Sequence, residues 1–197
     1  MRLKQLSRTA LTQIDSAPRS RQSSSSQSPP MIAASFTKGR RRAVDQPESE
    51  FHTGGGAGLF STAPDYVTFT RMLLAGGALD GVEVLKPETI KLMARNAIGD
   101  LNVPMVRSNN PALALEVETF PGQIKKWGLS FLINTEDIEG FRSAGSLTWG
   151  GVHNTYFWID LKKRITAVAL MQILPIGDPI VQETMIAFER ALYAAIA

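Results

Sequence analysis

The alternation of apolar and polar positions is clearest in the second half of the chain. From residue 126 to residue 133 every second side chain is apolar, which predicts a strand with one buried face. Two further runs, 155–160 and 165–173, are rich in aromatic and β-branched residues and are joined by a short polar connection. The pattern therefore predicts an antiparallel sheet that contains a hairpin.

Three segments have helical periodicity instead. They begin at Thr62, Pro87 and Asp178, with proline in the first turn of each. The apolar residues expected on their buried faces are, in chain order, Tyr66, Phe69, Met72, Leu73, Ile90, Leu92, Met93, Val181, Met185, Phe188, Leu192 and Ile196. Residues 99–122 lack periodicity and predict an irregular segment. The order of elements predicts an α+β fold, an antiparallel sheet with helices packed against it.

Residues 145–160 combine a turn with a strand. The segment begins with small residues, passes through Gly150 and Gly151, and continues as an aromatic and β-branched run. Glycine within a strand marks a bulge or a place where another group approaches the backbone closely. The segment is therefore a candidate wall of a binding site.

Charge divides the chain into two parts. Residues 1–44 hold nine Lys or Arg and one acid, whereas residues 45–197 hold twelve Lys or Arg and seventeen acids. The Ser-rich stretch 20–30 has too little apolar area to offset the entropy of ordering its backbone. We expect a disordered basic tail over residues 1–50 and a globular domain over residues 51–197.

The composition of the tail is also that of an organelle transit peptide, with a leader of no selected role as the alternative. The basic run from Lys38 to Arg42 has no interleaved aromatic residues for stacking on bases, so we expect a solvated charge run and no nucleic acid partner. No apolar run reaches the roughly 20 residues of a membrane span.

Cysteine is absent, which excludes disulfides, thiolate catalysis and Cys-based zinc sites. Neither His52 nor His153 has a further ligand at metal-binding spacing. We therefore expect no metal and no cofactor. His153 follows the glycine pair closely, and is either a pocket-lining residue or a partly exposed strand residue.

Three segments resemble the β-lactamase-related serine hydrolases, the superfamily of penicillin-binding proteins, class C-like β-lactamases and family VIII carboxylesterases. Residues 54–66 resemble the family element GGGGLxSTAxDY, and residues 85–93 resemble its LSPETVxLM element. Residues 149–152, followed by 157–160, resemble its third active-site motif and the next strand. The resemblance covers the chain from about residue 50 and implies the C-terminal portion of the β-lactamase/transpeptidase-like fold.

The resemblance implies acyl transfer from a small ester or amide through a serine ester. In the family, a Ser-x-x-Lys motif supplies the nucleophile, and a Tyr-x-Asn motif assists proton transfer. Trp149, Gly150 and Gly151 match the third motif, which borders the pocket at a sheet edge, and His153 lies beside it. The Val152 N–H is then the donor to the oxyanion. Tryptophan at a position where lactamases have lysine favours neutral esters as substrates.

The other two motifs have no convincing match. Ser35 and Lys38 have the Ser-x-x-Lys spacing, but the arginine run that follows predicts no buried helix, and no tyrosine has asparagine two positions later. We expect a C-terminal fragment that is catalytically silent alone and self-associates through an exposed sheet edge. A non-catalytic binding module that kept the groove, soluble and monodisperse, is the alternative. A third reading makes the basic tail a nucleic-acid tether.

Overall fold

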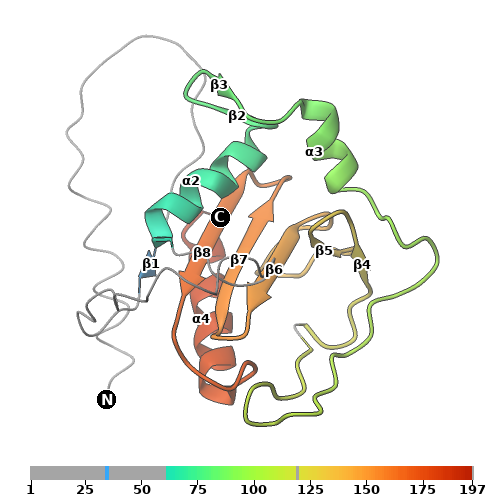
Figure 1. Cartoon of the computed structure of the whole chain (residues 1–197), viewed down its shortest axis with the longest axis vertical. Coiled ribbons are helices and arrows are strands. Elements are labelled where there is room, and N and C mark those ends of the chain that lie inside the picture. Colours follow the sequence, from blue (N-terminus) through green and yellow to red (C-terminus); the bar gives the residue numbers. More distant parts are fainter. Residues whose placement is uncertain (1–33, 36–60, 119, 197) are drawn as a thin grey trace, which may run out of the picture. The chain divides into compact units, whose positions relative to one another are not determined.

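The computed structural model describes residues 34–35, 61–118 and 120–196 (Figure 1). The helices are α2 (Ala63–Leu74), α3 (Pro87–Met93) and α4 (Pro179–Ala194). The strands are β1 (Ala34–Ser35), β2 (Ala78–Leu79), β3 (Val82–Glu83), β4 (Lys125–Trp127), β5 (Leu132–Asn134), β6 (Leu147–Gly151), β7 (Thr155–Asp160) and β8 (Ile165–Leu170). The predictions for the rest of the tail, the glycine-rich segment 54–58, Lys38 and His52 fall outside the described residues.

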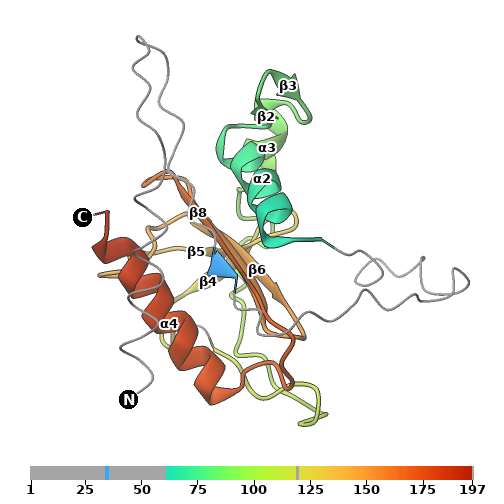
Figure 2. The same ribbon diagram turned by 90° about the vertical axis from the view of Figure 1, so that its left-hand side faces the viewer.

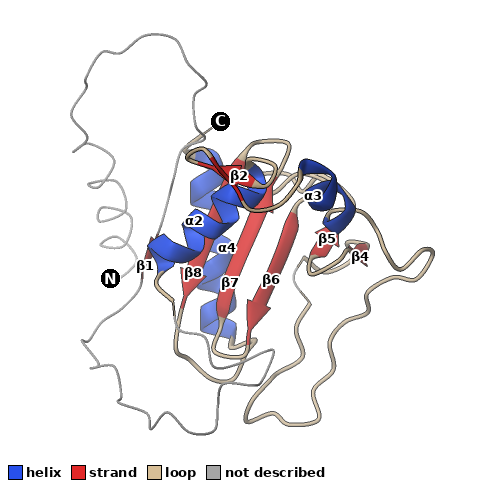
Figure 3. Cartoon of the chain, turned by 45° about the horizontal axis from the view of Figure 1, so that its top comes forward, coloured by secondary structure: helices blue, strands red, loops and turns tan. Residues whose placement is uncertain are grey.

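One six-stranded sheet organises the described residues, with the strand order β1-β8-β7-β6-β5-β4. Strands β4 to β8 pair antiparallel, and β1 pairs parallel with β8. Helix α2 covers one face of the sheet and α4 the other (Figure 2). Strands β8, β7 and β6 run side by side in the middle of the sheet (Figure 3). The predicted α+β fold and the predicted hairpin of β7 and β8 are confirmed.

Helix α2 begins where the capping pattern predicts. The Thr62 Oγ1 accepts a hydrogen bond from the Asp65 N–H at 3.3 Å and donates to the Asp65 carboxylate at 2.7 Å. The predicted buried face was wrong in part, because Phe69 is 42% exposed whereas Val67 and Thr70 are fully buried. Residues spaced by three and four from Val67 face the sheet, and Phe69 lies outside that stripe.

The single strand expected over residues 126–133 was also wrong. The chain forms β4, reverses and returns as β5, and the Gly128 N–H donates to the Phe131 carbonyl at 2.8 Å. Ser130 takes a left-handed φ of 81°, which supports the reversal. As a result Leu129 is 46% exposed and does not share the buried face of Phe131.

Apolar side chains fill both sides of the sheet. On the α2 face the core includes Val67, Leu73, Leu147, Phe157, Ile159 and Val168. On the α4 face it includes Trp158, Ile165, Ala167, Leu192 and Tyr193. The predicted stripe of α4 is confirmed at Val181 and Leu192, whereas Ile196 follows the end of the helix and is 39% exposed. In α3 only Ile90 is buried, and the described residues between 99 and 122 form no helix or named strand, as expected.

A buried carboxylate ties β7 to α4. Asp160 is fully buried and accepts hydrogen bonds from the backbone N–H groups of Ser143, Lys162 and Lys163 at 2.8, 3.1 and 2.8 Å. The Tyr193 hydroxyl donates a fourth at 2.9 Å. With four donors the desolvated charge is satisfied.

Stability should fall with rising pH above about 10 because of Tyr193. Burial, and then the Asp160 carboxylate, raise the pKa of its phenol above the ordinary value of 10.0. The native state therefore keeps a proton that the unfolded chain loses, so the contribution is complete below about pH 10 and is lost as the pH rises further. Urea unfolding from about pH 8 to about pH 11 should show a shallower decline in Tyr193→Phe than in the wild type. Parallel declines would contradict this assignment.

Candidate functional site

The residues Trp149, Gly150 and Gly151 form the last part of β6. They pair with Phe157, Tyr156 and Thr155 of β7, respectively. On its other side β6 pairs with β5 only as far as Thr148. Among the described residues, no strand therefore pairs with the last three residues of β6 on this side, which is called the open edge of β6.

The direction of the backbone groups on β6 follows from its hydrogen bonds. The Ser146 carbonyl accepts a bond from β5, and the Gly151 carbonyl accepts one from the Asn154 N–H on the β7 side. Backbone groups alternate between the two sides along an antiparallel strand. The N–H groups of Gly150 and Val152 therefore point toward the open edge, beyond the end of β5. Within the described residues, the Val152 N–H has no backbone acceptor.

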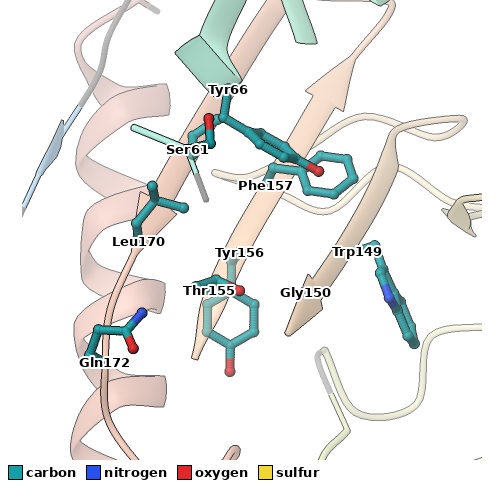
Figure 4. A pocket seen from close by; sticks show the side chains of 10 residues that line it. Ser61, Tyr66, Trp149, Gly150, Thr155, Tyr156, Phe157, Leu170 and Gln172 are labelled. Atoms are coloured by element: carbon teal, nitrogen blue, oxygen red, sulfur yellow. The ribbon is translucent and has the colours of Figure 1, made fainter. Parts of the chain in front are cut away.

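A cavity of about 290 Å³ lies against this end of the sheet, on the face that α2 covers (Figure 4). Its apolar side is formed by Tyr66, Phe157, Val168 and Leu170. The Tyr66 and Phe157 rings pack with their centroids 5.4 Å apart. This apolar side suits a hydrocarbon group of a ligand.

The described residues on the polar side of the cavity carry no formal charge. The side chains of Ser61, Thr155 and Gln172 contribute hydroxyl and amide groups, and Gly150 contributes backbone. Among the described residues that line the cavity there is no Lys, Arg, His, Asp or Glu. An uncharged lining favours a neutral ligand, because an ion buried there would lack a partner.

Of the predicted site residues, Trp149 and Gly150 line the cavity, whereas Gly151, Val152 and His153 do not. Trp149 is 48% exposed and packs edge-to-face on Trp127 with ring centroids 4.6 Å apart. Val152 is 43% exposed in the turn between β6 and β7. His153 is exposed in the same turn and does not line the cavity.

Sequence reasoning missed Tyr66, Thr155 and Gln172. Tyr66 was assigned to a buried helix face, and burial does raise the pKa of its phenol. The three residues come from α2, from β7 and from the segment after β8, so no local pattern connects them. Their meeting depends on the packing of α2 against the sheet.

Asn154 holds the turn that carries Val152. It is fully buried and has a left-handed φ of 59°. Its amide nitrogen donates to the carbonyls of Ile173 and Pro175 at 2.9 and 2.8 Å. Its oxygen accepts from the Gly177 N–H at 3.2 Å and from the Tyr156 hydroxyl. The turn is thereby fixed to residues 173–177, which preorganises the neighbouring N–H groups.

Two serines bear on the question of a nucleophile. Ser35 lies in β1, and β8 and β7 separate it from β6. Three strand spacings of about 4.8 Å set its backbone about 14 Å from β6. Ser61 lines the cavity, and its hydroxyl donates to the Thr62 carbonyl at 3.4 Å.

Residues 61–118 and 120–196 contain no group of three or more His, Cys, Asp or Glu side chains arranged to hold a metal ion. The helices of the described ranges are too short or too polar to cross a membrane.

The sequence is similar to proteins named as an esterase and as a methylbutanoyltransferase. It is 32% identical to lovastatin esterase of Penicillium rubens over 146 residues. The aligned region covers 71% of this chain and 35% of the esterase. It is 30% identical over 145 residues to monacolin J acid methylbutanoyltransferase of Aspergillus terreus, covering 71% of this chain and 34% of the relative. The chain thus spans about a third of the length of these relatives.

Solved structures agree with this relationship. Unliganded simvastatin synthase from Aspergillus terreus superimposes with a TM-score of 0.53 at 28% identity, over 68% of this chain and 34% of that one. A mutant of the same enzyme gives 0.56 at 26% identity, over 68% and 35%. The model of the family described as Beta-lactamase matches residues 4–189. The chain belongs to the β-lactamase family, and its described part has the C-terminal portion of the β-lactamase-like fold.

Proposed function

We propose that this chain forms the oxyanion side of an acyl-transfer site for neutral esters, and that the chain alone binds such esters without turning them over. The observation that carries the proposal is the open edge of β6, toward which the N–H groups of Gly150 and Val152 point beyond the end of β5. Relatives named as an esterase and a methylbutanoyltransferase support ester chemistry at this edge.

The chemistry expected of the edge is stabilisation of negative charge on an ester carbonyl oxygen. The Val152 N–H is the proposed donor, and the anchored Asn154 keeps it in place without reorganisation. Trp149, Gly150 and Gly151 border the substrate, and glycine lets the ester lie close to the backbone. His153 is proposed to approach the substrate only from outside the cavity, since it is exposed in the turn.

The nature of the lining supports a neutral ester as ligand. A β-lactam carries a carboxylate that requires a cationic partner, whereas Trp149 stands where lactamases have lysine and no cavity-lining residue that the structure describes is charged. The apolar side formed by Phe157, Val168 and Leu170 would receive a small acyl chain.

The expected lack of catalytic activity in the isolated chain follows from the positions of Ser35 and Ser61. A nucleophile must reach the carbon whose oxygen the Val152 N–H binds, within about 3 Å. The backbone of Ser35 is about 14 Å from β6 by strand spacing. Ser61 lines the cavity, but the neighbouring Tyr66 has a raised pKa and stays protonated near neutral pH, so it is no base for the hydroxyl.

A chain that binds esters without turnover is either a fragment of a larger hydrolase or a binding module that keeps the groove, and the formed cavity of about 290 Å³ favours the binding module. The two candidates differ in solution behaviour. A fragment should self-associate through the open edges of the sheet, whereas a binding module should elute as a single monomeric species in size-exclusion chromatography.

Hydrolysis of p-nitrophenyl butyrate tests the silent chain. We expect release of p-nitrophenol at the rate of buffer alone, and the same rate in Ser35→Ala and Ser61→Ala. The uncharged ester methyl butyrate should nevertheless change the fluorescence of Trp149 saturably, a change that Trp149→Phe removes. Hydrolysis by the wild type that disappears in either serine variant would overturn the proposal that the chain is inactive.

A further inference from the structure

The hydroxyl of Thr155 differs from those of the other threonines in the sheet. Thr148 donates to the Phe157 carbonyl at 2.6 Å, and Thr166 donates to the Trp158 carbonyl at 3.0 Å. Within the described part of the chain, the Thr155 hydroxyl has no such partner, and the residue lines the cavity. A strand hydroxyl that faces a cavity and is not used internally can bond a ligand.

The place of this hydroxyl is fixed by Gly151. The two residues are directly opposite each other in the β6–β7 ladder. A Cβ atom added to Gly151 would lie 2.6 Å from the Thr155 Oγ1, so the hydroxyl occupies the space that the missing side chain leaves open. Because threonine is branched at Cβ, its χ1 is restricted and the hydroxyl is held more firmly than the Gln172 amide. The Thr155 hydroxyl therefore lies beside Gly151, the residue that directly precedes Val152.

We propose that Thr155 is a specificity-determining residue that hydrogen-bonds a hydroxyl on the acyl group of a neutral hydroxy ester. The proposal rests on the function proposed above, in which the ester carbonyl binds the Val152 N–H. Thr155 is opposite Gly151, the residue before Val152, and opposite residues in a ladder have Cα atoms about 5 Å apart. A hydroxyl two carbons from the ester carbonyl would reach across Gly151 toward Thr155, while the carbonyl turns to the Val152 N–H at the open edge. The described residues of the lining carry no charge, which disfavours a carboxylate or phosphate in the same role.

Two methyl esters that differ by one hydroxyl test this assignment. Methyl butyrate and methyl 3-hydroxybutyrate are titrated against the full chain, Thr155→Val and Thr155→Ser, with Trp149 fluorescence as the readout. The wild type should bind the hydroxy ester about three- to tenfold more tightly than the plain ester, the range of one hydrogen bond. In Thr155→Val, which keeps the branched shape, this ratio of dissociation constants should fall to about one. Thr155→Ser restores a hydroxyl and should keep most of the preference.

The outcomes separate the two levels of the proposal. A wild-type preference that persists unchanged in Thr155→Val overturns the role of Thr155 and leaves ester binding intact. Equal binding of both esters by the wild type also overturns it. Binding of neither ester would contradict the proposed function itself, and with it the role of Thr155.

Discussion

Replacing Arg142 with alanine should lower the free energy of unfolding by about 3–5 kcal/mol. Its guanidinium forms a two-pronged pair with Glu189 of α4, with Nε to Oε1 at 2.8 Å and Nη2 to Oε2 at 2.5 Å. The two side chains are only 7% and 5% exposed. Without Arg142, the Glu189 carboxylate would be buried without a countercharge, and that desolvation cost dominates the effect.

The same guanidinium also contacts two aromatic rings. It lies 5.1 Å from the ring centroid of Phe120 and 5.2 Å from that of Trp158. These contacts connect the irregular segment 99–122 with the α4 face of the sheet, and add to the loss in Arg142→Ala.

Two control variants separate charge from geometry. Arg142→Lys keeps the charge but not the planar fork, so it should lose less than Arg142→Ala. The double variant Arg142→Met with Glu189→Leu removes both charges and should recover most of the stability. Urea unfolding followed by far-UV circular dichroism measures all three. A loss below about 1 kcal/mol in Arg142→Ala would show that solvent screens the pair.

Features that depend on a few consecutive residues were predictable from the sequence. The starts of α2 and α4 followed from Thr62 and Asp178, whose side chains each accept a bond from an N–H three residues later. The turn between β2 and β3 has the same local character, because Asp80 and Gly81 both take left-handed φ values. Such signals are local, so tertiary packing does not override them.

The strand over residues 126–133 failed because alternation does not report where a chain reverses. Gly128 and Ser130 carry the reversal, and Gly128 packs so closely against the Met93 carbonyl that a side chain would clash. A single glycine in an alternating pattern is compatible with both a strand and a turn. The contact with Met93, from a segment 35 residues earlier by numbering, decided between them.

In the candidate site, too, contiguous residues were predictable from the sequence, whereas residues brought together by packing were not. The segment from Trp149 to Val152 is contiguous, so its motif could be recognised from the sequence. Tyr66 and Thr155 could not be assigned to the cavity, since they meet only after α2 packs on the sheet. The pair of Arg142 and Glu189 is separated by 47 positions and follows from the packing of α4.

Val152→Pro should weaken the binding of methyl butyrate about tenfold, because proline has no N–H to donate to the ester carbonyl. Residue 152 is the second residue of a turn that the Asn154 N–H closes on the Gly151 carbonyl at 3.0 Å. Proline is favoured at this position of a turn, so the fold should persist. Val152→Ala keeps the N–H and should bind like the wild type. Equal weakening in both variants would assign the effect to the side chain of Val152.

In the proposed function, the Val152 N–H binds an ester carbonyl at the open edge of β6. The most direct measurement is the chemical shift of the Val152 amide proton, followed by two-dimensional NMR as the full chain is titrated with methyl butyrate. We predict a saturable downfield shift with the dissociation constant that Trp149 fluorescence gives. A Val152 amide proton that stays in place while the Trp149 signal saturates would contradict the claim.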